Sequence, residues 1–265
     1  MTDAGADSKP VVVLRERRGQ VEVLTLNRPE ARNAVNGEVA KQMTAALDNL
    51  EKDEDLRVIV LTGAGDKAFC AGMDLKAFGS GSGGSIGGGT GGFAGFARRA
   101  IPVPVIAAVN GPALAGGFEL VLACDLVVAA EHAVFGIPEV KRGLLAAGGG
   151  LVRLPKRLPL ATALELALTG DSISAARAYE LGLVNLVVPA DRVLDEALAL
   201  AGRIIENAPL SVRYSRQVTL QAAEVSEEEA WKLSDDATQV VFASADAREG
   251  PLAFAEKRAP NWQGR

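Results

Sequence analysis

Two glutamates and a pair of adjacent glycines lie within one apolar stretch of the chain, residues 105–139. Gly116 and Gly117 are expected to open a short apolar helix with Glu119 in its first turn, and Glu139 follows at the exit of a strand. The first amides of a helix have no intrahelical partner and point along the positive end of its dipole. Glycine lets a ligand approach that backbone closely. The stretch therefore offers free amide donors together with two carboxylates.

The two carboxylates are expected to differ in acidity. The charged form of Glu119 would be stabilised by its position in the first turn of a helix, which suits a base. Glu139 follows the apolar residues 135–138, where desolvation would favour its protonated form, as an acid requires. Two carboxylates with pKa values pushed apart indicate proton transfer. A purely structural explanation fits the same pattern: the glycines form a tight turn, and the glutamate only pairs with the helix dipole. This stretch alone does not decide between that explanation and a catalytic site.

A second loop, residues 63–76, could supply another donor. Asp74 is expected to cap the helix that follows it. The amides around Met73 would then face outward at the start of that helix, where they could stabilise a developing oxyanion. Taken alone, this loop is better explained as a simple capped loop.

The composition excludes several classes of protein. The 265 residues are 48% hydrophobic and 23% charged, which is ample for one large core or a core with a small appendage. The net charge of −5 argues against a general nucleic-acid surface. The single histidine, His132, and two cysteines, Cys70 and Cys124, argue against a zinc site, a Ser-His-Asp triad and a disulfide framework. His132 is expected in a surface turn and Cys124 in the core, and Cys70 is assigned no role.

No export signal or membrane span is expected. The acidic N-terminus has no apolar h-region, and no apolar run reaches the roughly 20 residues of a membrane helix. The sequence therefore predicts a cytoplasmic protein.

Strands and helices alternate over the first 190 residues. Strands are expected at residues 11–13, 21–26, 58–62, 105–109 and 184–188, the first two around a turn at Arg18 and Gly19. Helices are expected at residues 36–51, capped by Asn36, and at 93–100, 116–123, 148–158, 160–168 and 174–181, the last capped by Ser174. Arg153, Lys156 and Arg157 are expected to form a solvated face.

From residue 191 the pattern becomes entirely helical. Four helices are expected, at residues 191–206, 209–223, 226–242 and 245–257. The chain is therefore predicted to consist of an α/β core, residues 1–190, and a C-terminal helical region, residues 191–265, which covers a partner or a neighbouring subunit.

Residues 79–92 are rich in glycine and serine. Such a segment cannot bury a core and is expected to be a flexible lid or spacer over a pocket. A phosphate cradle is disfavoured because no Gly-Lys-Ser/Thr closes the segment and no strand leads directly into it.

Six motifs, in this order, resemble the enoyl-CoA hydratase/isomerase family, the crotonase superfamily. They are LNRPEARNAV (26–35), AFCAGMDLK (68–76), AAVNGPALAGGFELVLACDLVVA (107–129), FGIPEVKRG (135–143), ALELALTGDSISAARAYELGLVNLVV (163–188) and FAEKR (254–258). Together they cover nearly the whole chain, and their combination is specific although each alone is not. The resemblance implies a crotonase-like spiral of ββα units with C-terminal helices used for trimerisation, and trimers that often pair into hexamers.

The resemblance also implies roles for individual residues. The amides of Met73 and Gly116 would form an oxyanion hole for the thioester carbonyl of an acyl-CoA substrate. Glu119 would act mainly as the base on the attacking water, and Glu139 would protonate C2 of the enoyl chain. The residues expected near coenzyme A are Arg28, Arg32, Ala71, Asp74, Leu75 and Lys76, with Phe254 and Lys257 from a neighbouring subunit. No metal or redox cofactor is implied, since coenzyme A is part of the substrate.

Having both glutamates favours a hydratase, which adds water reversibly to a trans-2-enoyl-CoA to give a 3-hydroxyacyl-CoA. Two departures from the family pattern leave substrate and reaction open: Met73 stands where a smaller residue is common, and Ala146 replaces a proline, with Ala147 beside the water site. The alternatives are an isomerase that shifts a double bond with Glu139 as the proton shuttle, and a non-catalytic acyl-CoA binding protein. Acyl chain length, head-group and the choice between trimer and hexamer are not determined by the sequence.

Overall fold

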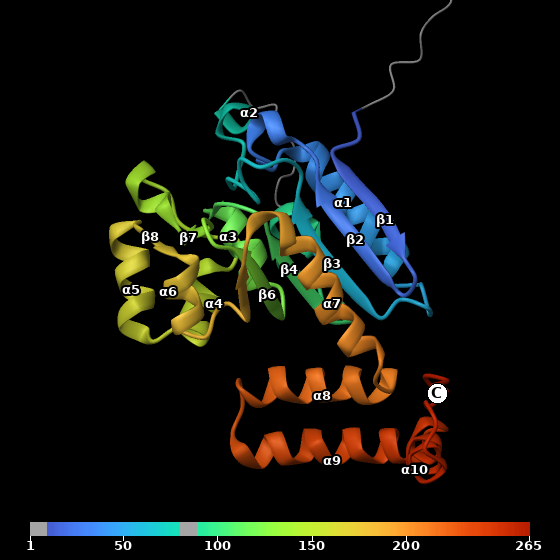
Figure 1. The fold of residues 1–265 in the computed structure, drawn as a ribbon. Helices are drawn as coiled ribbons and strands as arrows, with labels where there is room; N and C mark the ends of the chain where they lie inside the picture. The colour runs from blue at the N-terminus through green and yellow to red at the C-terminus, as the bar shows by residue number, and fades with distance from the viewer. Residues whose placement is uncertain (1–9, 80–88) are drawn as a thin grey trace, which may run out of the picture.

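The computed structural model describes residues 10–79 and 89–265 and contains two sheets (Figure 1). The larger sheet has the order β1-β2-β3-β4-β6-β9 and the smaller sheet the order β5-β7-β8. The strands of the larger sheet are β1 (Val13–Arg18), β2 (Val21–Leu26), β3 (Val58–Gly63), β4 (Val105–Val109), β6 (Leu126–Ala130) and β9 (Leu186–Val188). Those of the smaller sheet are β5 (Ala113–Leu114), β7 (Val134–Gly136) and β8 (Ser172–Ser174). The predicted α/β class is confirmed.

The central strands are apolar because helices cover both faces of the sheet. Strands β2, β3, β4, β6 and β9 pair in parallel, and every residue of β3 and β4 is buried. Helix α7 (Val193–Ile205) crosses one face and α1 (Gly37–Leu50) lies on the other (Figure 1). Continuous apolar runs such as VIVLT are the expected sequence of strands buried on both sides.

The chain repeats one local unit: a strand of the larger sheet, a short strand or bridge in a second layer, and a helix. The unit is complete in β4, β5 and α3 (Gly116–Leu122). In the preceding unit, β3 leads to Cys70, which bridges Ala113 of β5 in parallel, and then to α2 (Leu75–Gly79). Because successive units pair in parallel, the starts of α2 and α3 are brought side by side.

The remaining helices follow the sequence predictions closely. They are α4 (Gly150–Arg157), α5 (Leu160–Thr169), α6 (Ala175–Glu180), α8 (Pro209–Ala222), α9 (Glu227–Ala243) and α10 (Asp246–Glu256). The predicted caps are confirmed: the side chain of Asn36 accepts a hydrogen bond from the Val39 amide at 3.0 Å, and that of Ser174 from the Arg177 amide at 3.2 Å.

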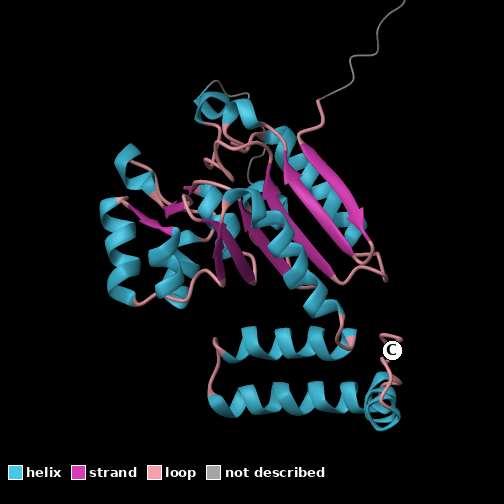
Figure 2. Ribbon diagram, viewed as in Figure 1, coloured by secondary structure: helices cyan, strands magenta, loops and turns pink. Residues whose placement is uncertain are grey.

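The last helices stand apart from the sheet. Helices α8 and α9 form an antiparallel pair, with α10 at one end of it (Figures 1 and 2). Arg216 of α8 ties this pair to the core by a 2.8 Å contact with the Asp125 carboxylate and a 3.0 Å hydrogen bond to the Ile101 carbonyl. The boundary at residues 190 and 191 and the trimerisation role of these helices stay predictions.

Two sequence predictions about elements are wrong. The first strand does not end at residue 13 but begins there, and the turn after it is at Gly19 and Gln20. Five of the six residues of β1 are exposed on this edge strand, so no apolar run marked it. Residues 93–100 are not a helix; only the 3₁₀ helix η3 (Phe93–Gly95) forms, because Ala94 (φ 58°) and Gly95 (φ 69°) adopt left-handed conformations.

Part of the predicted flexible segment, residues 80–88, lies outside the described residues, while Gly89–Gly91 form a 3₁₀ turn, η2. In the described part of the chain, no helix is both long and apolar enough to span a bilayer. The same part holds no cluster of three or more histidine, cysteine, aspartate or glutamate side chains suited to a metal ion. The cytoplasmic location stays a prediction.

Candidate active site

The two predicted oxyanion donors lie on adjacent segments. Gly72 has a φ of +91°, and a Cβ there would lie only 3.0 Å from the Gly116 nitrogen. Just before the two helices, the Leu114 amide donates to the Cys70 carbonyl at 3.0 Å. Among the residues that the structure describes, neither the Met73 amide nor the Gly116 amide donates a hydrogen bond. Two unpartnered N–H groups thus stand at neighbouring helix starts.

This close approach requires glycine at the start of α3. A Cβ at Gly117 would lie 2.0 Å from the Cys70 carbonyl oxygen, which is backbone and cannot rotate away. Ala115, directly before the helix, has a φ of 51°, a conformation that costs free energy for a residue with a side chain. The tight packing of these two segments explains the Gly-Gly pair and this local strain.

Glu119 is buried, with 3% of its surface exposed, and its Oε1 accepts a hydrogen bond from the Gly150 amide at 2.8 Å. Burial raises the pKa of Glu119, and the amides of residues 148–150 and the positive charge of Arg153 oppose that rise. The prediction that Glu119 would favour its charged form is therefore wrong in net direction. Burial dominates, and the support for the carboxylate comes from the start of α4 instead of α3.

Glu139 lies in the 3₁₀ helix η4 (Pro138–Arg142). Its Oε2 is buried and has no hydrogen-bond partner among the described residues. Burial raises the pKa of Glu139 to about 7, and the nearby charge of Glu119 adds to the rise, while its own backbone amide opposes it. The predicted shift toward an acid is confirmed in direction and cause. The two carboxylates share one site, and one of them presents a free oxygen.

Residues 16–265 match the family model for enoyl-CoA hydratase/isomerase. The chain belongs to this family. It is 46% identical over 257 residues to enoyl-CoA hydratase EchA19 of Mycobacterium tuberculosis, covering 95% of this chain and 96% of the relative. It is 42% identical over 253 residues to carnitinyl-CoA dehydratase of Proteus mirabilis, covering 94% and 97%. The crystal structure of an enoyl-CoA hydratase from M. tuberculosis matches with a TM-score of 0.92 at 49% identity, covering 96% of this chain and 99% of that one. The predicted crotonase-like fold is confirmed.

The sequence analysis assigned no role to one buried residue that connects two loops near the candidate site. Asn33 is 1% exposed; its Oδ1 accepts from the Arg28 amide at 3.0 Å, and its Nδ2 donates to the carbonyls of Ala64 and Ala68 at 2.9 Å each. It therefore ties the loop after β2 to the loop that leads to Met73. A signal was present, because asparagine between a strand and a helix is among the residues that best tolerate the positive φ seen here, 55°.

Asn33→Ala is expected to lower the free energy of unfolding by about 1–3 kcal/mol, because it leaves buried backbone groups without partners. Urea denaturation of both proteins measures the loss. Asn49→Ala, on the exposed side of α1, is the matched control and should unfold close to wild type. An Asn33→Ala midpoint equal to that of the control would contradict the role given to these three hydrogen bonds.

The residues predicted near coenzyme A fall into two groups. Arg28 and Asp74 form an ion pair at 3.0 Å, and Arg28 also donates to the Ala34 carbonyl at 2.6 Å. Asp74 accepts from the Ala77 amide at 3.2 Å, as predicted for a cap. Around this pair, Ala71 is half-buried and three residues are exposed: Arg32, Leu75 and Lys76. Their contacts with coenzyme A stay predictions.

Phe254 and Lys257 belong to the second group. Phe254, in α10, is 87% exposed, and Lys257 caps the same helix. Helix α10 lies far from α2 (Figure 1), so one chain does not bring these residues to the site. Their contribution to a neighbouring subunit stays a prediction.

The solvated face predicted on α4 is wrong for both arginines. Arg153 is half-buried and donates to the Ala97 carbonyl at 2.6 Å, and Arg157 donates to the Cys124 carbonyl at 3.0 Å. Only Lys156 is exposed, where it pairs with Glu224. The cause is tertiary: this side of α4 packs against α3 and the turn after η3.

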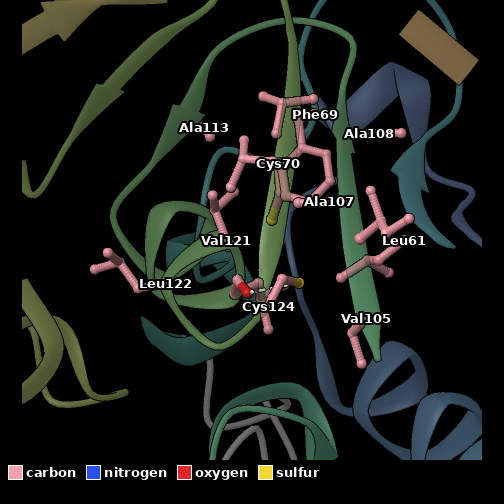
Figure 3. Packing of buried hydrophobic residues seen from close by; sticks show 14 of the residues in the cluster. Leu61, Phe69, Cys70, Val105, Ala107, Ala108, Ala113, Val121, Leu122 and Cys124 are labelled. Carbon is pink, nitrogen blue, oxygen red and sulfur yellow. Dashed lines mark hydrogen bonds between the residues drawn. The ribbon is translucent and has the colours of Figure 1, made fainter. Parts of the chain in front are cut away.

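Both cysteines are core residues. Cys70 and Cys124 lie among apolar side chains of β3, β4 and α3 (Figure 3). Burial raises the pKa of both thiols, that of Cys70 to about 12. The prediction for Cys124 is confirmed, and neither thiol has the exposed, electropositive surroundings of a reactive cysteine.

Proposed function

We propose that this protein catalyses the reversible addition of water to a trans-2-enoyl-CoA, giving a 3-hydroxyacyl-CoA. The observation that carries the proposal is the pair formed by Glu119, which is buried, and Glu139, which is half-buried. Within the described part of the chain, Oε2 of Glu139 is buried without a hydrogen-bond partner. A reaction that moves two protons, one from water and one to carbon, needs a base and an acid of this kind. Relatives named enoyl-CoA hydratase support the same reaction.

In the proposed reaction, the thioester oxygen accepts hydrogen bonds from the Met73 and Gly116 amides. Glu119 takes a proton from water as the water oxygen bonds to C3, and the C2–C3 π electrons move toward the thioester. Negative charge then develops on the oxygen that the two amides face. Glu139 delivers a proton to C2, and the product is neutral overall. Loss of one such amide donor typically lowers the rate by about 10²–10³-fold.

Dehydration of a 3-hydroxyacyl-CoA is the same reaction in reverse, and the relatives named carnitinyl-CoA dehydratase suggest it as the working direction on a specialised acyl group. A double-bond isomerase would use Glu139 alone as the proton shuttle. A non-catalytic acyl-CoA binding protein would use neither carboxylate. The presence of both carboxylates in one site favours hydration over both of these.

Absorbance at the conjugated enoyl-thioester band tests the proposal directly. Crotonyl-CoA and a longer trans-2-enoyl-CoA should lose the band in the presence of the enzyme, and carnitinyl-CoA tests the specialised alternative by gaining it. A 3-enoyl-CoA that gains the band while crotonyl-CoA is inert would replace hydration by isomerisation. Acyl-CoA binding without any spectral change would support the binding protein.

The oligomer belongs to the same proposal. A homotrimer, alone or paired into a hexamer, would let Phe254 and Lys257 reach a neighbour's coenzyme A, which the exposure of Phe254 allows. Sedimentation velocity distinguishes a monomer from a trimer and a hexamer.

A further inference from the structure

Phe93 lies between the two halves of the site. Its Cζ and Cε1 are 2.4 and 2.5 Å from the point where a Cβ on Gly116 would sit, so the tip of the ring rests on that glycine. At its other end, the Cβ of Phe93 lies 3.1 Å from the position that a Cβ on Gly148 would take. The Oε2 of Glu119 lies 2.4 Å from that same position. The side chain therefore extends from beside the Glu119 carboxylate to the first residue of α3.

The turn that carries Phe93 is held on several sides. The Phe93 carbonyl accepts hydrogen bonds from the amides of Phe96 and Ala97 at 3.1 and 3.0 Å. The Ala97 carbonyl accepts from Arg153 at 2.6 Å, which joins the turn to α4. Gly95 packs so closely on Thr44 of α1 that a Cβ there would lie 2.1 Å from its hydroxyl oxygen. The backbone that carries Phe93 is thus anchored, and its ring forms a wall between Gly116 and the Glu119 carboxylate.

This wall borders the reacting carbons. In the proposed function, on which this step rests, the thioester oxygen is bound beside Gly116, and C2 and C3 lie toward the two glutamates. A ring that runs from Gly116 to the Glu119 carboxylate then flanks the C2–C3 bond. We propose that Phe93 is a specificity-determining residue that excludes acyl groups branched at C2 or C3 and admits straight ones.

The size of the effect follows from the size of a methyl group. One methyl or methylene group in an apolar pocket typically changes discrimination by about 10–200-fold. A shorter side chain at position 93 opens that volume without adding a polar group. The preference for straight over branched acyl groups should therefore fall stepwise from wild type to Phe93→Leu to Phe93→Ala.

The test compares kcat/KM for crotonyl-CoA with kcat/KM for 3-methylcrotonyl-CoA and 2-methylcrotonyl-CoA. The branched-to-straight ratio is expected to rise about tenfold or more in Phe93→Leu and further in Phe93→Ala. Phe242→Ala is the matched control; this phenylalanine is 74% exposed on α9, and its loss should leave the ratio unchanged. A ratio that is the same in all four proteins would overturn the proposal.

Binding of unreactive acyl-CoA esters separates this inference from the proposed function. Calorimetry with wild type should show butyryl-CoA binding about tenfold or more tightly than isovaleryl-CoA and 2-methylbutyryl-CoA, with a smaller gap in Phe93→Leu. If these affinities are found but crotonyl-CoA is not hydrated, the specificity role of Phe93 is supported and the proposed hydratase activity is refuted. If crotonyl-CoA is hydrated but straight and branched esters bind with equal affinity, the specificity role of Phe93 is refuted and the proposed hydratase activity is not. The wild-type comparison stands even if a variant does not fold.

Discussion

Glu119→Gln is expected to lower kcat/KM for enoyl-CoA hydration by about 10²–10⁴-fold, the usual loss when a general base is removed. Glutamine has nearly the same shape, and its amide oxygen can still accept the 2.8 Å hydrogen bond from Gly150. The variant therefore keeps the packing of α3 against the start of α4 and loses only the group that takes the proton from water. Disappearance of the crotonyl-CoA band measures the rate.

The matched control for this variant is Glu165→Gln, which makes the same chemical change on the exposed surface of α5. It should hydrate crotonyl-CoA at the wild-type rate. Circular dichroism and urea denaturation should show both variants folded. A Glu119→Gln protein that hydrates crotonyl-CoA as fast as the control would refute the assignment of Glu119 as the base.

Glu139→Gln is expected to cause a loss of similar size, about 10²–10⁴-fold, together with a changed pH profile. Glu139 must be protonated to deliver its proton to C2, and its pKa is raised to about 7. The protonated fraction falls as the pH rises through that value, so kcat/KM of wild type should fall above about pH 7. On the acid side, kcat/KM should fall as Glu119 becomes protonated, at a pH above its ordinary range because its pKa is raised.

The alkaline fall is the specific signature of Glu139. Glutamine does not titrate, so the residual activity of Glu139→Gln should not fall above about pH 7, whereas Glu119→Gln should keep the alkaline fall and lose the acid one. Crotonyl-CoA hydration between about pH 4 and pH 9, a range that begins near the ordinary pKa of a glutamate, measures the profiles. An alkaline limb that persists unchanged in Glu139→Gln would show that another group titrates there.

The surroundings of both glutamates are built by other parts of the chain. Glu119 comes from α3, but its carboxylate meets the start of α4, and the Gly150 amide that it accepts from is 31 residues away in sequence. Glu139 comes from η4, and its Oε2 has no hydrogen-bond partner in residues 10–79 and 89–265. In such a site, more backbone amides stabilise the charged form of Glu119 than that of Glu139. Two carboxylates in different surroundings are the arrangement that proton transfer at two positions requires.

Features that depend on neighbouring residues could be predicted from the sequence. Continuous apolar runs predicted β3 and β4, Asn36 and Ser174 predicted two helix starts, and the order of motifs predicted the family and fold. These features are local or are carried by residue type, since hydrophobic periodicity and capping act within a few positions of the chain. The edge strand β1 was placed wrongly because its exposed, charged residues carry no such pattern.

The groups that surround each carboxylate depend on tertiary packing and could not be predicted from the sequence. The raised pKa of Glu119, the hydrogen bonds of Arg153 and Asn33, and the ring of Phe93 against Gly116 all depend on residues that are distant in the sequence. Desolvation is a property of the packed site, and it outweighed the helix dipole that the local sequence at Glu119 indicated. Burial and the start of α4 determine the acidity of Glu119, and the ring of Phe93 lies between its carboxylate and Gly116.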